Sequence, residues 1–372
     1  MAGYECADHI NRDGERINLL QETQHDVRVL EDYALLHGMG IGVVREGICW
    51  SAVERADGSF NFDEVLARIK AAQIFGIQQI WDLIHFGYPD GLYPTHPLFC
   101  RRFIDLCTAF AQFYTSHTTQ QLFVVPINEI SFLSWHSGDV RGTVPFAINS
   151  GWDIKYHLCK AAILGIRALK EADPGCRIVL VEPLIYRHHE NSDIQNNDTN
   201  EFQFQAMDII AGRICPELGG DESFLDILGF NYYWNCQWYG NNQTLPWPEE
   251  EGKQRIPFSE LLKSAYGRYQ KPLFVSETGH FGIGRAQWIE EITAECILAL
   301  NDGVPIEGIC IYPVTDRPDW DNLNNYFHCG VWDLDHRKNR IPHNGYIYAI
   351  TECMAKITAY FTKTYSKFTI KF

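Results

Sequence analysis

The sequence predicts an α/β protein, a single (β/α)8 barrel that spans residues 1–372. Apolar runs of strand length alternate along the chain with segments of helical periodicity, which is typical of a parallel sheet covered by helices. We count eight such units, whereas an open doubly wound sheet normally stops at about five or six strands and carries a glycine-rich phosphate loop. No such loop motif occurs in the chain, and barrels routinely reach this length as one domain.

The expected strands and helices follow one another in order. The first strand begins at Ala2, and later strands are expected at residues 41–50, 77–85, 123–129, 177–183, 225–233, 272–277 and 308–313. Helices are expected between them at residues 24–37, 62–75, 97–114, 152–170, 201–215, 258–269 and 286–301. In the first helix, the spacing predicts an apolar face made of Val27, Leu30, Tyr33 and Leu36. Longer connections follow strands rather than helices, so they gather at the C-terminal end of the barrel, where such folds carry their sites.

The composition argues against several classes of partner. A formal net charge of −16 would repel nucleic acid and anionic membranes, so we expect a neutral or cationic small-molecule ligand. The 12 cysteines are scattered without zinc-like spacing, and the first residues lack a signal-peptide pattern. We therefore expect reduced thiols in a cytoplasmic protein, with no membrane span, no cofactor and no metal. His188 and His189 beside Glu190 lie in a polar stretch, where a solvated loop is expected rather than a metal site.

Two glutamates stand at the ends of otherwise apolar strands. The run at residues 123–130 ends in Asn128 and Glu129, and the run at residues 272–279 delivers Glu277. A single strand-end glutamate more often caps a helix or pairs with an arginine. These two would lie on the fourth and seventh strands, where they face one another across the pocket of a barrel. Such a pair suits glycoside hydrolysis, in which one carboxyl group protonates the leaving oxygen and the other attacks or stabilises the anomeric carbon.

Other polar and aromatic residues suit the same chemistry. Arg45 in the second expected strand would keep one carboxylate ionised, and Asn128 would hold a sugar hydroxyl. Glu182, at the end of the fifth expected strand, is a third strand-end carboxylate that we expect to hold a hydrogen-bond network. Tyr233 belongs to an aromatic cluster after the sixth strand, and aromatic faces stack well on sugar rings.

Five short motifs occur in order along the chain: VREGICWS at residues 44–51, HFGYP at 85–89, NEI at 128–130, GFNYY at 229–233 and VSETG at 275–279. They resemble the YRFSISWSR, HWDLP, NEP, GxNYY and ITENG motifs of glycoside hydrolase family 1, the β-glucosidase family of the retaining clan A barrels. The resemblance spans the whole chain. It implies that Glu129 is the acid/base and Glu277 the nucleophile. It also implies that His85 and Asn128 contact sugar hydroxyls and that Tyr233 donates to the nucleophile.

Two segments depart from the family pattern. After the eighth strand, the family's WSLLDNFEW is replaced by YPVTDRPDW at residues 312–320, so Tyr312 takes the place of a tryptophan platform and Asp319 that of a sugar-binding glutamate. In the first strand, a glutamine that grips sugar hydroxyls is replaced by a choice of Glu5, Asp8 and His9.

We therefore expect a retaining β-glycosidase that hydrolyses a small β-linked glycoside through a covalent glycosyl-enzyme. Trp50, Tyr312, Asp319 and Trp320 join Arg45 among the residues expected to contact substrate. Two alternatives remain: a transglycosylase that uses the same two glutamates, and a barrel that binds sugar without turning it over. The sequence identifies neither the glycone nor the aglycone, and it leaves the oligomeric state open.

Overall fold

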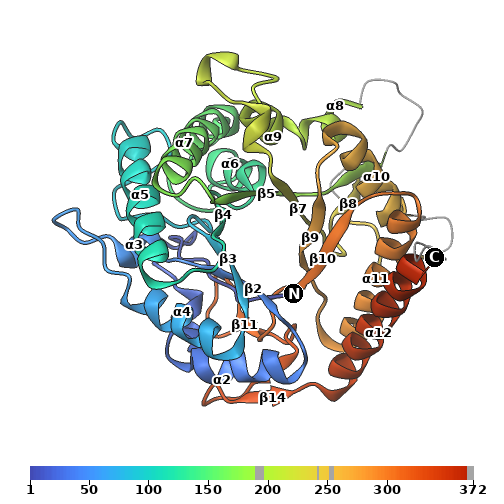
Figure 1. The fold of residues 1–372 in the computed structure, drawn as a ribbon. Helices are drawn as coiled ribbons and strands as arrows, with labels where there is room; N and C mark the ends of the chain where they lie inside the picture. Colours follow the sequence, from blue (N-terminus) through green and yellow to red (C-terminus); the bar gives the residue numbers. More distant parts are fainter. Residues whose placement is uncertain (189–196, 241–242, 251–254, 367–372) are drawn as a thin grey trace, which may run out of the picture.

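The computed structural model describes residues 1–188, 197–240, 243–250 and 255–366. Eight parallel strands close into a barrel, which confirms the predicted fold (Figure 1). In ring order they are β1 (Ala2–Gly3), β2 (Val43–Gly47), β3 (Gln78–Asp82), β4 (Phe123–Val125), β5 (Arg177–Pro183), β7 (Ile227–Asn231), β9 (Leu273–Thr278) and β10 (Ile306–Ile311). Ala2 pairs with both Val44 of β2 and Ile311 of β10, so the short first strand completes the ring.

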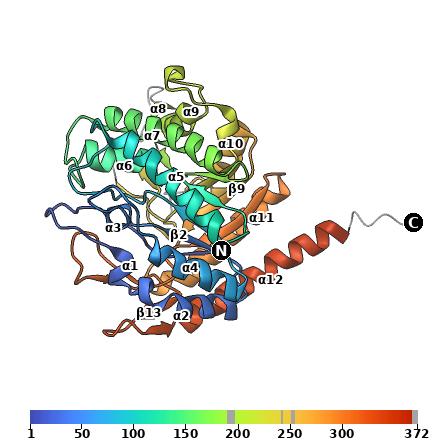
Figure 2. The ribbon, with the colours of Figure 1, turned by 60° about the vertical axis from the view of Figure 1, so that its left-hand side comes forward.

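Helices cover the outer face of the barrel (Figure 1). The main ones are α2 (His25–Gly38), α4 (Asp63–Phe75), α5 (Phe99–His117), α7 (Gly151–Ala172), α9 (Gln205–Ile210), α10 (Phe258–Tyr269), α11 (Arg285–Asn301) and α12 (Asn344–Ser366). The last of these continues beyond the rest of the molecule (Figure 2). Within the described residues, no helix combines the length and the apolar character needed to cross a membrane.

Shorter elements lie in the connections between the barrel strands and the main helices. The short α-helices are α1 (Leu19–Glu22), α3 (Trp50–Val53), α6 (Ile130–Gly138) and α8 (Asn197–Phe202). The short paired strands are β6 (Tyr186–His188) with β8 (Gln237–Tyr239), β11 (Arg317–Pro318) with β12 (Tyr326–Phe327), and β13 (Trp332–Leu334) with β14 (Arg340–Pro342). The connection after β10 therefore folds back on itself as two small hairpins, and it carries Arg317 toward the end of the barrel.

Three local predictions need correction. The helix expected at residues 201–215 is replaced by the two short helices α8 and α9. The second strand ends at Gly47, so Trp50 begins a helix rather than ending a strand. In α2, Tyr33 and Leu36 are buried as predicted, but Val27 and Leu30 are 75% and 55% exposed. The buried face also includes the polar side chains of His25 and Asp32.

That buried face of α2 is held by charge. His25 lies between two carboxylates, with Nδ1 2.6 Å from Asp32 and Nε2 2.9 Å from Glu46 of β2. Arg340 of β14 donates to both oxygens of Asp32, and Arg68 of α4 donates to Glu46. Because each buried charge has a partner of opposite sign, α2 can pack on the barrel through polar residues that hydrophobic periodicity does not detect.

The interior of the barrel is divided along its axis. Toward the N-terminal ends of the strands, the interior is lined by apolar side chains, which pack as one cluster: Ile80, Val125, Val179, Val181 and Phe274. Toward the C-terminal ends, the inward-facing side chains are polar or charged, and they include Arg45, Asp82, Asn231 and Glu277. The barrel therefore has an apolar floor beneath a polar cluster, and the candidate site lies in that cluster.

Candidate active site

Glu129 stands at a sharp turn between β4 and α6. Its backbone adopts the left-handed conformation (φ 47°, ψ 59°), which is uncommon for a residue other than glycine. Two contacts with β5 stabilise this turn: the Glu129 amide donates to the carbonyl of Val181 (3.0 Å), and the Ser131 amide donates to the carboxyl group of Glu182 (3.1 and 3.2 Å). Glu182 thus holds a hydrogen-bond network, as predicted, and it fixes the direction in which Glu129 leaves the strand.

Glu277 lies near the end of β9 and is only 5% exposed. Its Oε1 atom accepts a hydrogen bond from NH1 of Arg45 (2.7 Å), and its Oε2 atom accepts one from the hydroxyl of Tyr233 (2.8 Å). Both oxygens are therefore occupied by donors, one of them cationic, which is the environment that a carboxylate requires.

Two amides and one guanidinium connect the two glutamates. Asn231 of β7 donates to Oε1 of Glu129 at 2.9 Å, and the same nitrogen lies 3.5 Å from Oδ1 of Asn128. That oxygen accepts from NH2 of Arg45 at 2.7 Å, and Arg45 in turn donates to Glu277. Asn128, Asn231 and Arg45 are each fully buried, so the network is held away from solvent.

The two carboxyl groups differ in charge. Burial and, second, the negative charge of Glu277 together raise the pKa of Glu129 to about 8. Although burial disfavours the charge on Arg45, the carboxylates of Asp82 and Glu277 raise its pKa well above the usual value. Near neutral pH, the site therefore holds a protonated Glu129 opposite an arginine-paired Glu277.

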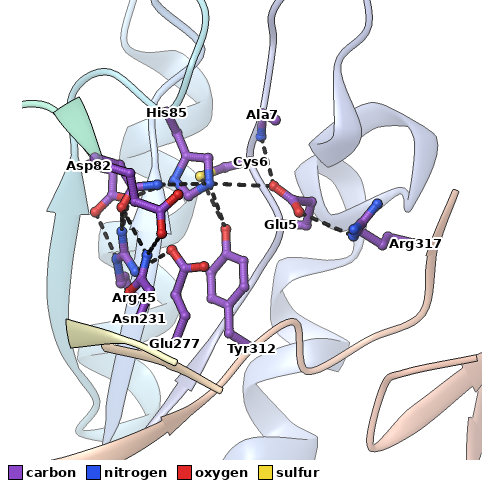
Figure 3. Close-up of polar contacts among 12 residues, drawn as sticks. Glu5, Cys6, Ala7, Arg45, Asp82, His85, Asn231, Glu277, Tyr312 and Arg317 are labelled. Carbon is purple, nitrogen blue, oxygen red and sulfur yellow. Dashed lines mark hydrogen bonds and ion pairs between the residues drawn. The ribbon is translucent and has the colours of Figure 1, made fainter. Parts of the chain in front are cut away.

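A chain of charged side chains continues from Arg45 (Figure 3). Asp82 accepts from Nε and NH2 of Arg45 at 3.0 and 2.6 Å and lies 2.8 Å from Nδ1 of His85. The Nε2 atom of His85 is 3.6 Å from Glu5, which pairs with Nε of Arg317 at 3.3 Å. Although burial opposes a charge on His85, its contacts with Cys6 and Asp82 raise its pKa well above the usual value.

Tyr312 forms one wall of this cluster. Its ring stacks on His85 with the centroids 5.8 Å apart and the planes 15° apart, and its hydroxyl lies 3.3 Å from Nε2 of His85. The guanidinium of Arg45 lies 5.5 Å from the centre of the same ring. Tyr312 is thus a buried aromatic side chain beside His85 and Arg45, and its role as a platform for sugar stays a prediction.

The comparisons with known structures concern the whole barrel. A family 1 β-glucosidase from Thermotoga maritima in complex with isofagomine lactam superposes with a TM-score of 0.73 at 16% identity, covering 89% of this chain and 87% of that chain. At this identity, the likeness is one of fold, that of a (β/α)8 barrel. The AHE enzyme from Alicyclobacillus herbarius gives a TM-score of 0.76 at 16% identity, covering 90% of this chain and 87% of that one. No protein-family model matches the sequence, and no curated protein matches it.

The barrel does not bring every predicted residue to the site. The prediction that Trp50 contacts substrate is contradicted by its position: the side chain is fully buried and packs on Phe99 and Phe103 with ring centroids 5.6 Å away. Its indole N–H donates to Glu54 at 2.7 Å. Because the strand ends at Gly47, Trp50 turns toward the helical layer instead of the pocket.

The predicted residues after β10 have different surroundings. Trp320 is partly exposed, packs 4.7 Å from His9 and 5.2 Å from Phe86, and has Arg317 5.8 Å from its ring. Asp319 accepts from two backbone amides of its own loop, those of residues 321 and 322. Asp319 therefore caps a turn in this structure.

Two residues of the cluster, Asp82 and Asn231, were not expected at the site. They end β3 and β7, so the signal that marks Glu129 and Glu277, a polar residue at the end of a strand, marks them too. Glu5 was one of three candidates in the first strand, and sequence periodicity carries no signal for its pairing with Arg317 of β11.

Two clusters of described residues have ligand atoms close enough for a metal ion, but both are already paired with arginine. The first cluster consists of Cys6, Asp82 and His85, and Arg45 binds the carboxylate of Asp82. The second cluster consists of Asp316, His328 and Asp333. Here Arg285 binds Asp333, and Asp316 accepts hydrogen bonds from backbone amides. A cation at either place would face a guanidinium. His188 contacts Gln237 at 2.9 Å, whereas His189 and Glu190 lie outside the described residues.

Proposed function

We propose that this chain is a retaining β-glycosidase that hydrolyses a small β-linked glycoside by double displacement. The observation that carries the proposal is the pair of strand-end glutamates: the pKa of Glu129 is raised, and both oxygens of Glu277 accept hydrogen bonds. Glu129 has a pKa of about 8 and so keeps its proton near neutrality, while Glu277 accepts hydrogen bonds from Arg45 and Tyr233. One acid and one carboxylate facing a common pocket are what this reaction requires.

In the first step, an oxygen of Glu277 attacks the anomeric carbon and forms an ester bond to it. The bond from that carbon to the glycosidic oxygen breaks, and the oxygen takes the proton of Glu129, so the aglycone leaves as an alcohol. In the second step, ionised Glu129 accepts a proton from water, and the water oxygen attacks the anomeric carbon. The ester bond breaks, Glu277 regains its charge, and two inversions give net retention.

The surrounding side chains support these roles by their positions. Arg45 and Tyr233 hold Glu277 in one orientation through separate oxygens, and Asn231 orients Glu129. Asn128 and His85 lie between them and would contact sugar hydroxyls, and the ring of Tyr312 would lie against the sugar. Arg45, Asn128 and Asn231 are buried before ligand binds, which favours a fixed geometry over one assembled by the substrate.

The similarity in fold supports the same class of ligand. A Thermotoga maritima family 1 glycoside hydrolase complexed with a cyclophellitol analogue transition state mimic matches this chain with a TM-score of 0.73 at 15% identity, covering 89% of this chain and 87% of that one. At this identity, the likeness concerns the barrel, and the argument for activity rests on the glutamate pair.

Trapping of the covalent intermediate tests the proposal. The protein is incubated with activated 2-deoxy-2-fluoro glycosides of several sugars, and its intact mass and peptide map are measured. We expect one adduct on Glu277 from at least one sugar, and none in Glu277→Gln. Absence of adducts and of turnover across a broad panel, in a folded protein, would contradict the proposal and favour a barrel that only binds sugar.

A further inference from the structure

A cavity of about 340 Å³ opens at the N-terminal end of the barrel, the end away from the candidate active site. We infer that it binds an uncharged aliphatic molecule, with the polar end of that molecule at the cavity mouth. Small-molecule sites in proteins enclose about 300–1,000 Å³, so the space is sufficient for a ligand. The inference goes beyond the proposed function, because the described residues that line the cavity include neither glutamate nor any member of their hydrogen-bond network.

The walls of the cavity come from the first residues of the barrel strands. Its apolar lining is contributed by six strands: Val43, Ile80, Phe123, Val179, Ile227 and Phe274. Because side chains alternate along a strand, the residues that follow three of them point outward, and Val44, Val124 and Leu228 pack between the barrel and the helices. The strand pattern therefore places a ring of apolar side chains around the cavity.

Two valines close the cavity toward the candidate active site. Val125 and Val181 belong to the same apolar cluster without lining the cavity, and they are 0% and 2% exposed. The carbonyl of Val181 accepts the hydrogen bond from the amide of Glu129, so this valine lies level with the catalytic glutamates. A layer of side chains therefore separates a molecule in the cavity from a substrate in the candidate site.

The walls of the cavity favour carbon atoms over water. An ordered water in a protein interior needs about two to four polar partners. The six apolar side chains offer none, and the backbone behind them is paired in the sheet, as Val43 is with Gln78 and Val179 with Ile227. A dry apolar cavity of about 150 Å³ takes benzene. The larger space here therefore has room for roughly twice as many carbon atoms.

The mouth of the cavity carries charges of both signs. Arg177 and Glu307 line it, and both side chains are exposed. Arg177 lies 3.9 Å from Asp226, whose carboxylate also pairs with Lys170 at 2.9 Å. The two cations and the two anions cancel, so a charged end of either sign gains no net attraction and loses hydration. A hydroxyl loses less hydration, and it can accept from Arg177 or donate to Glu307.

Titration calorimetry with 1-hexanol, 1-octanol, octanoate and octylammonium tests the inference. We expect one saturable site for 1-octanol, with an affinity about fifteenfold higher than for 1-hexanol, because each buried methylene contributes about fourfold. Octanoate and octylammonium should each bind at least about tenfold more weakly than 1-octanol, because a charged end loses hydration at the mouth. An equal or higher affinity for either ion would overturn the assignment of an uncharged end.

Two variants locate the bound alcohol in the cavity. Ile227→Trp puts a larger side chain into the space and should abolish binding of 1-octanol, whereas Val43→Phe removes less space and should weaken it by at least about tenfold. Leu298→Trp is the matched control, because Leu298 is 50% exposed on α11, and its affinity for 1-octanol should equal that of the wild type. Circular dichroism and thermal unfolding confirm that each variant is folded. Absence of saturable binding in the wild type, or unchanged binding in both cavity variants, would overturn the inference.

Discussion

The alkaline limb of the pH profile should report the proton on Glu129. Its pKa of about 8 means that about 90% of the molecules carry this proton at about pH 7, and only about 10% at about pH 9. The sign follows from the direction of the shift: a raised pKa keeps the acid form present below about 8 and loses it above. We therefore expect kcat/KM to fall about tenfold per pH unit beyond that point.

The variant that tests this assignment is Glu129→Gln, whose amide oxygen can still accept the hydrogen bond from Asn231. For an alkyl glycoside, loss of the acid should reduce kcat/KM by roughly 10²- to 10⁴-fold. For a dinitrophenyl glycoside, the first step needs no proton, so its rate in Glu129→Gln should be close to the wild-type rate. The second step should become slow, because it lacks the general base. Added azide, which needs no general base, should restore turnover and give a β-glycosyl azide.

The pH profile of this variant supplies the refutation. With the alkyl glycoside, whose first step uses the proton, the limb near pH 8 should be absent from the residual activity, because the titrating group has been removed. A limb that persists there in Glu129→Gln would assign the titration to another group, and the reasoning about Glu129 would be wrong. Glu182 is the next candidate, since burial raises its pKa to about 7.

Three further outcomes are expected. Glu277→Gln should lose more than about a thousandfold in kcat, and removing the charge of Glu277 should lower the pKa of Glu129, which carboxyl signals in NMR titration would report. Glu182→Gln keeps an acceptor for the Ser131 amide but removes a charge that raises the pKa of Glu129, so the alkaline limb should move to lower pH; a limb that stays in place would contradict this coupling. Arg340→Met leaves Asp32 buried with one cationic partner fewer and should destabilise the fold by about 3–5 kcal/mol in denaturant titrations. Adding Asp32→Asn should recover part of that loss, and a double variant no more stable than the single one would argue against the charge as its cause.

The sequence predicts the barrel well because its strands are nearly continuous apolar runs that end in polar residues. That pattern locates Glu129 and Glu277 on opposite strands without reference to any relative. It fails where burial does not follow hydrophobicity. In α2, the charged pair His25 and Asp32 replaces the apolar face that Val27 and Leu30 suggest.

Local conformation and long-range pairing account for the other differences between the predicted and the observed positions of site residues. Trp50 leaves the pocket because β2 ends three residues before it, and strand ends are poorly marked in sequence. Asp319 turns its carboxylate to its own loop, where two free backbone amides compete for it. The pairing of Glu5 with Arg317 depends on how the loop after β10 folds over the first strand, which neither segment specifies alone.

The side chains from Arg317 through Glu5, His85, Asp82 and Arg45 to Glu277 alternate in charge, and this alternation affects how the protein responds to salt. The chain as a whole carries a formal charge of −16, and its field in solution reaches about one Debye length, roughly 8–10 Å at physiological ionic strength. A neutral glycoside approaching through that field experiences little force and then meets a site whose own charges sum to zero. Its KM should stay nearly constant as salt is added, whereas an anionic inhibitor would meet less repulsion and bind more tightly at high ionic strength.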